Sequence, residues 1–253
     1  MKGLPRKTIV VAGGASGIGA ETCRRLAEEG SRVVVGDINM DGARSVVAEI
    51  TGASGSAVAV ECDISDESAC RELAEVAVRE YGGIDGLFNV AGNFREEVRH
   101  NDIDALNVPL EIWNETMAVN LAGYLLTTRA VLPSLLERGG GAIVNTLSGL
   151  AFYGDTRGPA YTASKSALVA FTRHVAKKWG PLGVRCNGIA PGLVLTETAL
   201  ASWSDEERAK FISLTTTPRP GRPSDIASMA SFLLSDDAEW INGQMHMVTG
   251  GRW

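Results

Sequence analysis

A tyrosine and a lysine with the right spacing for shared proton chemistry stand in the middle of the chain. Tyr161 and Lys165 are four residues apart and follow Pro159, so a helix beginning near the proline would place both side chains on one face. A phenol titrates near pH 10, and a positive charge roughly 6 Å away would stabilise its anion by about 2–3 kcal/mol. The pair could then move a proton at the oxygen of an alcohol or a ketone. An ordinary amphipathic helix can carry the same spacing, so the pair needs further support.

Ser148 offers that support, because it follows an apolar run at 142–147 that is typical of a buried strand. A serine hydroxyl at the carboxyl end of a strand can donate a hydrogen bond to the substrate oxygen that the tyrosine serves. The three side chains together predict a proton-transfer site for a carbonyl or an alcohol.

A glycine-rich turn near the amino terminus predicts a phosphate-binding site. A β-branched run at 8–12 is followed by Gly13-Gly14-Ala15-Ser16-Gly17-Ile18-Gly19 and then by a helical pattern at 20–29. The glycines would let the backbone approach a pyrophosphate, whose charge would face the helix amino terminus. A plain connection between a strand and a helix is the alternative, because the spacing G-x-x-x-G-x-G differs from the common dinucleotide fingerprint.

Two aspartates at predicted strand ends extend this site. Asp37 follows the second strand and could accept hydrogen bonds from both hydroxyls of an adenosine ribose, while it would repel a 2′-phosphate. No arginine stands beside it, since Ile38 and Asn39 follow, so the sequence favours NAD over NADP. Asp63, at the end of the third strand, could contact the adenine amino group. Helix capping is an alternative role for either aspartate, and for Ser65 beside Asp63.

Strands and helices alternate along the chain, which indicates a doubly wound α/β sheet with helices on both faces. Strands are predicted at 8–12, 31–36, 57–61, 86–90, 142–147, 184–190 and 244–248, and helices at 20–29, 41–50, 67–81, 110–138, 159 onward and 224–234. We expect a single domain over 1–253. The polar segment 93–109 reads as a loop that lines the substrate site, and the mixed segment 193–223 as a substrate lid on short helices.

Composition argues against several classes of partner. The net charge of −6 and the lack of a basic stripe argue against nucleic acid and anionic membranes. The apolar run near the amino terminus is too short for a secretory segment, so we expect a cytoplasmic protein. Four cysteines and three histidines are scattered, which argues against a metal site and against a disulfide.

These residues resemble the short-chain dehydrogenases/reductases, and the likeness covers nearly the whole chain. The resemblance is carried by Gly13-x3-Gly17-x-Gly19, Asn89-Val90-Ala91-Gly92, Asn120, Ser148, Tyr161-x3-Lys165, Asn187, Pro191-Gly192 and Gly221-Arg222-Pro223. It implies a Rossmann-type sheet of about seven strands and a homotetramer paired through the helices of Asn120 and Tyr161.

The resemblance also implies roles for single residues. Tyr161 would be the acid/base, Ser148 would hold the substrate oxygen, Lys165 would bind the ribose and lower the tyrosine pKa, and Asn120 would hold a water. The implied cofactor contacts are Gly13, Ser16, Gly17, Ile18, Gly19, Asp37, Ile38, Asp63, Ile64, Asn89, Ala91, Gly92, Tyr161, Lys165, Pro191, Gly192, Val194 and Thr196.

We therefore expect an NAD-dependent oxidoreductase that transfers a hydride between NAD(H) and a secondary alcohol or ketone. Its substrate would be a small molecule, apolar or cyclic, because the pocket wall is expected to include Phe94, Leu150, Tyr153, Leu200 and Trp203, with Phe152 and Trp253 as further candidates. The same aromatic residues could instead be core. Two alternatives are a 3-oxoacyl-carrier-protein reductase that uses NADPH and a dinucleotide-binding protein without catalysis.

Overall fold

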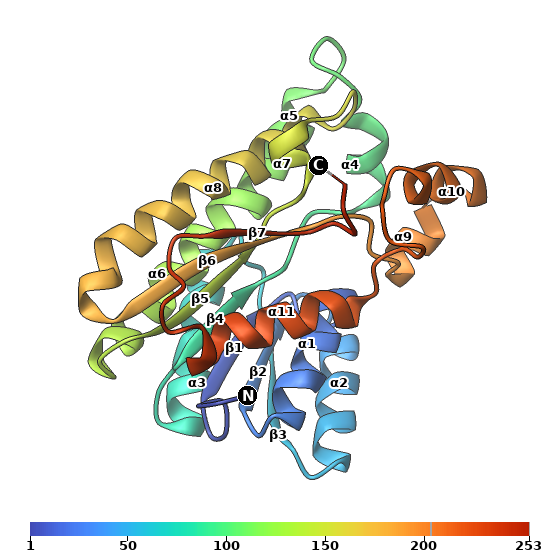
Figure 1. The fold of residues 1–253 in the computed structure, drawn as a ribbon. Helices are drawn as coiled ribbons and strands as arrows, with labels where there is room; N and C mark the ends of the chain where they lie inside the picture. Colours follow the sequence, from blue (N-terminus) through green and yellow to red (C-terminus); the bar gives the residue numbers. More distant parts are fainter. Residues whose placement is uncertain (203, 253) are drawn as a thin grey trace.

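The computed structural model describes residues 1–202 and 204–252, which fold around one parallel sheet in the order β3-β2-β1-β4-β5-β6-β7 (Figure 1). The strands are β1 (Thr8–Ala12), β2 (Arg32–Asp37), β3 (Ser56–Glu61), β4 (Gly86–Asn89), β5 (Gly141–Thr146), β6 (Val184–Pro191) and β7 (Met245–Val248). Every residue of β1 is buried, as is typical of a parallel strand covered on both faces. The predicted doubly wound sheet of about seven strands is confirmed.

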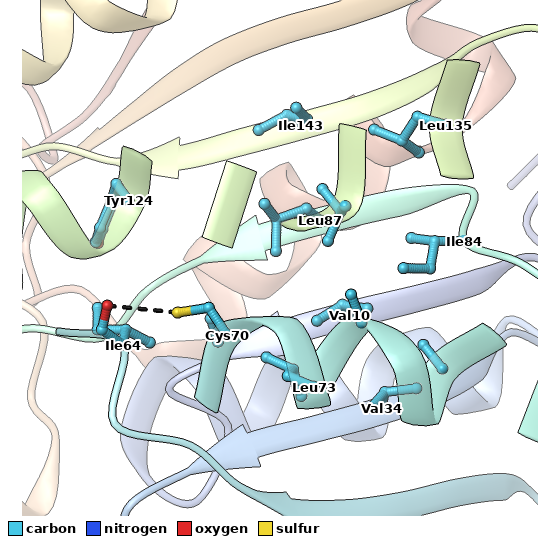
Figure 2. Packing of buried hydrophobic residues seen from close by; sticks show 14 of the residues in the cluster. Val10, Val34, Ile64, Cys70, Leu73, Ile84, Leu87, Tyr124, Leu135 and Ile143 are labelled. Atoms are coloured by element: carbon cyan, nitrogen blue, oxygen red, sulfur yellow. Dashed lines mark hydrogen bonds between the residues drawn. The ribbon is translucent and has the colours of Figure 1, made fainter. Parts of the chain in front are cut away.

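Successive side chains along the strands pack into two separate hydrophobic cores, one on each face of the sheet. Val10 and Val34 belong to the core under α3 (Glu67–Tyr81), α6 (Gly123–Glu137) and α8 (Pro159–Trp179). Figure 2 shows Leu73 of α3 facing Val10 and Val34. Ile9 and Val33 point the other way, into the core under α1 (Gly17–Glu28), α2 (Met40–Gly52) and α11 (Pro223–Leu234).

The order of the strands along the sheet reverses between β1 and β4, and this reversal positions the site. β1 pairs with β2 on one side and with β4 on the other, so the connections leave the sheet toward opposite faces. The carboxyl ends of β1, β4, β5 and β6 consequently meet at one edge, where parallel α/β sheets open a crevice for ligands.

Two segments differ from the sequence-based predictions. Residues 93–109 were expected to be a loop throughout, but they contain a short helix, α4 (Glu96–Asn101). It buries only Val98, so it has no apolar periodicity that the sequence could reveal. The helix predicted at 110–138 consists of α5 (Leu110–Met117), a π-helical turn η1 (Ala118–Ala122) and α6.

The remaining elements are short and are not among the helices that cover the two cores. They are α7 (Leu150–Tyr153), α9 (Glu197–Ser202), α10 (Asp205–Ser213) and the 3₁₀ turns η2 (Gly180–Leu182) and η3 (Asp236–Ala238). Figure 1 places α9 and α10 at the end of the molecule where the carboxyl terminus lies. In the described part of the chain no helix is both long enough and apolar enough to span a membrane.

Candidate active site

One cavity of about 640 Å³ lies at the carboxyl edge of the sheet. The predicted residues that line it are Gly13, Ser16, Gly17, Ile18, Gly19, Asp37, Ile38, Asp63, Ile64, Ala91, Gly92, Ser148, Tyr161, Lys165, Pro191, Gly192, Val194 and Thr196. They come from the ends of strands far apart in the sequence. The fold therefore brings the glycine turn and the predicted proton-transfer residues to the same space.

The backbone of the glycine turn packs so closely against neighbouring backbone that side chains at Gly13 and Gly19 would not fit. A Cβ on Gly19 would lie 1.9 Å from the carbonyl oxygen of Gly13. Gly13 itself has a φ of 101°, and a Cβ there would lie 2.5 Å from the amide nitrogen of Ala91. The turn thus exposes bare backbone before the amino terminus of α1, which is the arrangement that accepts a phosphate. These residues fit the pyrophosphate of a dinucleotide.

Asp37 is held in a fixed orientation at the end of β2. Its Oδ2 accepts a hydrogen bond from the amide of Ala15 at 2.9 Å, and its Oδ1 accepts one from the amide of Asn39 at 2.9 Å. The cap of α2 is Asn39, whose side chain accepts from the amide of Gly42. Asp37 is therefore tied to the glycine turn and does not cap the helix.

Asp63 organises the turn after β3 and also lines the cavity. Its Oδ1 accepts from the amide and the hydroxyl of Ser65 at 2.9 and 2.7 Å. The cap of α3 is Asp66, which accepts from the amides of Ser68 and Ala69. Neither Asp63 nor Ser65 caps the helix.

The amine of Lys165 is buried beside two aromatic rings. Its Nζ donates to the carbonyl oxygen of Thr146 at 2.8 Å and to the hydroxyl of Tyr124 at 3.3 Å. It lies 5.9 Å from the ring centroid of Tyr161 and 4.8 Å from that of Tyr124. Tyr124 was not singled out from the sequence, because an apolar-looking position on a helix gives no signal of a contact 41 residues away.

Burial dominates the ionisation of this pair. It raises the pKa of Tyr161 above its usual value, against a hydrogen bond with Ser148 that lowers it. It also lowers the pKa of Lys165 to about 7. Burial thus disfavours the charged form of both side chains, and the expectation that Lys165 lowers the pKa of Tyr161 stays a prediction.

Asn120 lies in the π-helical turn and is fully buried. Its Oδ1 accepts from the amide of Asn93 at 2.9 Å, and its Nδ2 donates to the hydroxyl of Ser164 at 3.3 Å. A π-turn often marks a functional position inside a helix. Asn120 joins the loop after β4 to the helix of Tyr161, and its implied role in holding a water stays a prediction.

Asn89 is not part of the cavity wall, in contrast to its predicted cofactor contact. Its Nδ2 donates to Oδ1 of Asn145 at 3.0 Å, and its Oδ1 accepts from the hydroxyl of Thr127 at 2.7 Å. This buried network joins β4 to β5 and to α6. Asn89 thus supports the turn of Ala91 and Gly92, which do line the cavity.

The substrate end of the cavity differs from the predicted apolar wall. Phe94 lines it, with its ring centroid 5.9 Å from that of Tyr161. Leu150, Tyr153 and Leu200 do not line it; the ring of Tyr153 instead lies under the guanidinium of Arg252 at 4.8 Å. Trp203 and Trp253 lie outside the described residues.

Polar residues that were not predicted complete this end of the wall. They are Arg95, Arg99 and Glu115. Arg95 forms an ion pair with Glu115, and Arg99 donates from Nε to the carbonyl oxygen of Phe94 at 3.0 Å. Arg99 lies in the short, mixed sequence of α4 and Arg95 directly precedes that helix, so apolar periodicity did not reveal them.

The chain matches known proteins over almost its full length. A family model described as enoyl-(acyl carrier protein) reductase matches residues 13–252. The 7alpha-hydroxysteroid dehydrogenase of Bacteroides fragilis is 35% identical over 251 residues, 99% of this chain and 96% of the relative. The D-threitol dehydrogenase of Mycolicibacterium smegmatis is 37% identical over 248 residues, 98% of this chain and 93% of the relative.

Solved structures agree with the sequence matches. A 7alpha-hydroxysteroid dehydrogenase complexed with NADH and 7-oxo glycochenodeoxycholic acid superposes with a TM-score of 0.91 at 33% identity, covering 98% of this chain and 94% of that chain. Family model, relatives and structure coincide over the segment that holds the cavity. The protein belongs to the short-chain dehydrogenase/reductase family of oxidoreductases.

Proposed function

We propose that the protein is an NAD-dependent dehydrogenase of a secondary alcohol, or equally a reductase of the matching ketone. The observation that carries this proposal is that one cavity is lined by the glycine turn, by Asp37 and by Ser148, Tyr161 and Lys165 together. The structure of a related enzyme in complex with NADH and an oxo-steroid acid supports it.

The residues of the chain have separate tasks in this scheme. Bound NAD would supply the hydride acceptor. Ser148 would hold the substrate oxygen, and Tyr161 would exchange the proton with it. Lys165 would contact the ribose and, in its charged form, stabilise the phenolate of Tyr161. Since burial keeps the pKa of Tyr161 high, the neutral phenol is ready to protonate a ketone, and oxidation of the alcohol should speed up as the pH rises.

Asp37 is the basis for proposing NAD rather than NADP. Both carboxylate oxygens of Asp37 accept hydrogen bonds from backbone amides. These bonds hold the negatively charged carboxylate at the cavity wall. A 2′-phosphate placed there would meet a like charge at short range, which costs several kcal/mol. Ile38, the next residue, is 70% exposed and apolar, so it offers no compensating cation.

The substrate proposal combines an apolar body with a polar substituent. Phe94 stands against Tyr161, so an apolar or cyclic group would lie next to the reacting carbon. Arg99 lines the same cavity, and in residues 1–202 and 204–252 it makes no ion pair. An anionic or hydroxyl-rich end of the substrate would be stabilised there.

Reduction of an acyl chain on a carrier protein is the second candidate, because the matching family model is described as an enoyl-(acyl carrier protein) reductase. That function predicts NADPH as the cofactor and a basic surface near the cavity that binds the carrier protein. Asp37 argues against NADPH. Glu96 and Glu97 on α4 argue against a basic surface, although Arg95 and Arg99 flank them. A dinucleotide-binding protein without catalysis is disfavoured by the intact Ser148, Tyr161 and Lys165.

The experiment is a turnover assay of the purified protein with NAD and with NADP. The panel holds cyclic, steroidal, sugar and aliphatic secondary alcohols, each class with a member that carries a carboxylate. We expect NADH formation with cyclic alcohols, and faster turnover for the carboxylate members. Turnover with an acyl carrier substrate and NADPH alone would favour the second candidate, and binding of NADH without any turnover would favour the third.

The assembly and location follow from the family only. We propose a homotetramer paired through α5, α6 and α8, because Ala163, Ala167 and Ala170 leave a small-residue face on α8 that is not fully buried in one chain. Light scattering that gives a monomer would contradict this. A cytoplasmic location is likewise a proposal, which fractionation of the source cells would test.

A further inference from the structure

The helix that carries Tyr161 begins without a cap of its own. Its N-cap is Gly158, which has a φ of 74° and no side chain, and its first residue is Pro159, which has no amide hydrogen. The first amides that need a partner are therefore those of Ala160 and Tyr161. Left unpaired in a buried position, they would cost stability and let the first turn open.

A carboxylate from a distant part of the chain provides these partners. Oδ1 of Asp102 accepts from the amide of Ala160 at 3.0 Å, and Oδ2 accepts from the amide of Tyr161 at 2.9 Å. The carbonyl oxygen of Asp102 also accepts from the amide of Gly158 at 2.9 Å. Asp102 is only 6% exposed, and a negative charge at a helix amino terminus is favourable.

Asp102 belongs to the segment 93–109, and Phe94, Arg95 and Arg99 of this segment line the substrate end of the cavity. The amide of Asp102 donates to the carbonyl oxygen of Val98, so Asp102 ends α4 while it caps α8. The same segment packs Phe94 against the ring of Tyr161. The segment and the catalytic helix are thus joined at the amide of the tyrosine itself and at its ring.

We propose that Asp102 is a positioning residue for the reaction: it holds the first turn of α8 so that the hydroxyl of Tyr161 stays aligned with Ser148 and Lys165. The inference rests on the proposed function, since it takes Tyr161 as the acid/base. It also makes the segment 93–109 part of the proton-transfer geometry, in addition to the substrate wall. Small misplacements of a catalytic group can cost on the order of 100-fold in rate.

Two variants and a control from the same segment test the proposal. Asp102→Ala removes both acceptors, and Asp102→Asn keeps one acceptor oxygen and so permits one of the two amide bonds. Asp104→Ala is the control. In residues 1–202 and 204–252 the Asp104 carboxylate accepts hydrogen bonds only within its own turn, from the amides of Leu106 and Asn107 and from the Asn107 side chain, and it does not line the cavity.

We expect Asp102→Ala to lower kcat by roughly 10-fold to 100-fold, with KM for the alcohol changed less and with NADH affinity kept, because the glycine turn and Asp37 are untouched. Asp102→Asn should recover part of kcat, and Asp104→Ala should match wild type. Wild-type kcat in Asp102→Ala would overturn the proposal. So would parallel losses of kcat, NADH affinity and thermal stability in Asp102→Asn, which would point to general unfolding.

Hydrogen exchange separates this inference from the proposed function, because it needs no substrate. In Asp102→Ala, the peptide covering residues 158–165 should exchange faster than in wild type, while peptides from β5 and the rest of α8 keep their protection. Unchanged exchange at 158–165 would contradict the inference whatever the substrate is. Suppose that exchange at 158–165 is faster in Asp102→Ala but the wild-type protein turns over no alcohol. The capping role of Asp102 would then be supported, and the proposed function would be overturned.

Discussion

The hydroxyl of Tyr124 accepts a hydrogen bond from Nζ of Lys165 at 3.3 Å and donates one to the carbonyl oxygen of Ala91 at 3.0 Å. The amine on α8 is thereby connected through α6 to the turn after β4, which lines the cavity. This contact helps to fix the position of Lys165, because in the described part of the chain its only other hydrogen-bond partner is the carbonyl oxygen of Thr146.

Removing that hydroxyl should loosen Lys165. In Tyr124→Phe, the carbonyl of Ala91 loses its donor, so the free energy of unfolding should fall by about 1–3 kcal/mol. The kcat should fall on the order of 10-fold, which corresponds to about 1.4 kcal/mol of lost transition-state stabilisation. Urea unfolding and steady-state rates measure the two effects. Tyr81→Phe is the control, because among the described residues that hydroxyl has a hydrogen bond only with the exposed Ser56. Equal rate losses in both variants would contradict the account.

Lys165 should also make stability depend on pH. Its pKa is about 7 in the folded protein, compared with 10.5 for an ordinary lysine. Between these values the unfolded chain binds more protons, so the free energy of unfolding rises with pH by up to about 1.4 kcal/mol per unit. Burial raises the pKa of the thiols of Cys23 and Cys186, and a hydrogen bond with Cys70, together with burial, raises that of Cys62. These shifts lower stability at higher pH, so the useful window is about pH 7 to 8.5.

The measurement compares wild type with Lys165→Met by urea unfolding at both ends of this window. The stability of wild type relative to the variant should rise by up to about 2 kcal/mol across it. Lys177→Met, an exposed lysine on the same helix, should keep the wild-type pH dependence. A constant difference between wild type and Lys165→Met would mean that the amine keeps its proton throughout.

Asp37 should control the choice between NAD and NADP. In Asp37→Ala the like charge facing a 2′-phosphate is gone, so the ratio of kcat/KM for NAD to that for NADP should fall by about 10-fold or more. Asp41→Ala changes the net charge equally, but its side chain is fully exposed on α2, and it should leave the ratio unchanged. If the ratio stays at the wild-type value in Asp37→Ala, the assignment of NAD to this site fails.

Gly19 should tolerate no side chain. The methyl group of Gly19→Ala would lie 1.9 Å from the carbonyl oxygen of Gly13, which forces the turn to shift and should cost about 1–3 kcal/mol of stability. NADH affinity, measured by fluorescence titration, should weaken with it. Gly52→Ala on α2 meets nothing within 4 Å and should stabilise by up to about 1 kcal/mol. Wild-type affinity in Gly19→Ala would argue against phosphate binding at this turn.

Local signals explain which parts of the molecule were predictable. The strands are buried β-branched runs, and the Tyr161 and Lys165 spacing survives in α8 as one helix face, so both follow from neighbouring residues. Tyr124, Asp102 and the ring contact of Phe94 depend on segments that meet only after folding. Asp102 lies 58 residues before Ala160, the first amide that it pairs. The sequence of 93–109 has no apolar periodicity from which the direction of its side chains could be predicted. For that reason the cavity-wall residues Arg95 and Arg99 were not predicted.

The most direct test of the central claim compares two tyrosine variants with NAD and the best alcohol of the panel. Tyr161→Phe should lose roughly 100-fold to 10,000-fold of kcat, the usual contribution of a positioned acid/base, while it binds NADH like wild type. Tyr81→Phe, whose hydroxyl accepts a hydrogen bond from the exposed Ser56 and which does not line the cavity, should keep wild-type turnover within a few-fold. Full turnover by Tyr161→Phe, measured as NADH absorbance, would contradict the assignment of Tyr161 as the group that moves the proton.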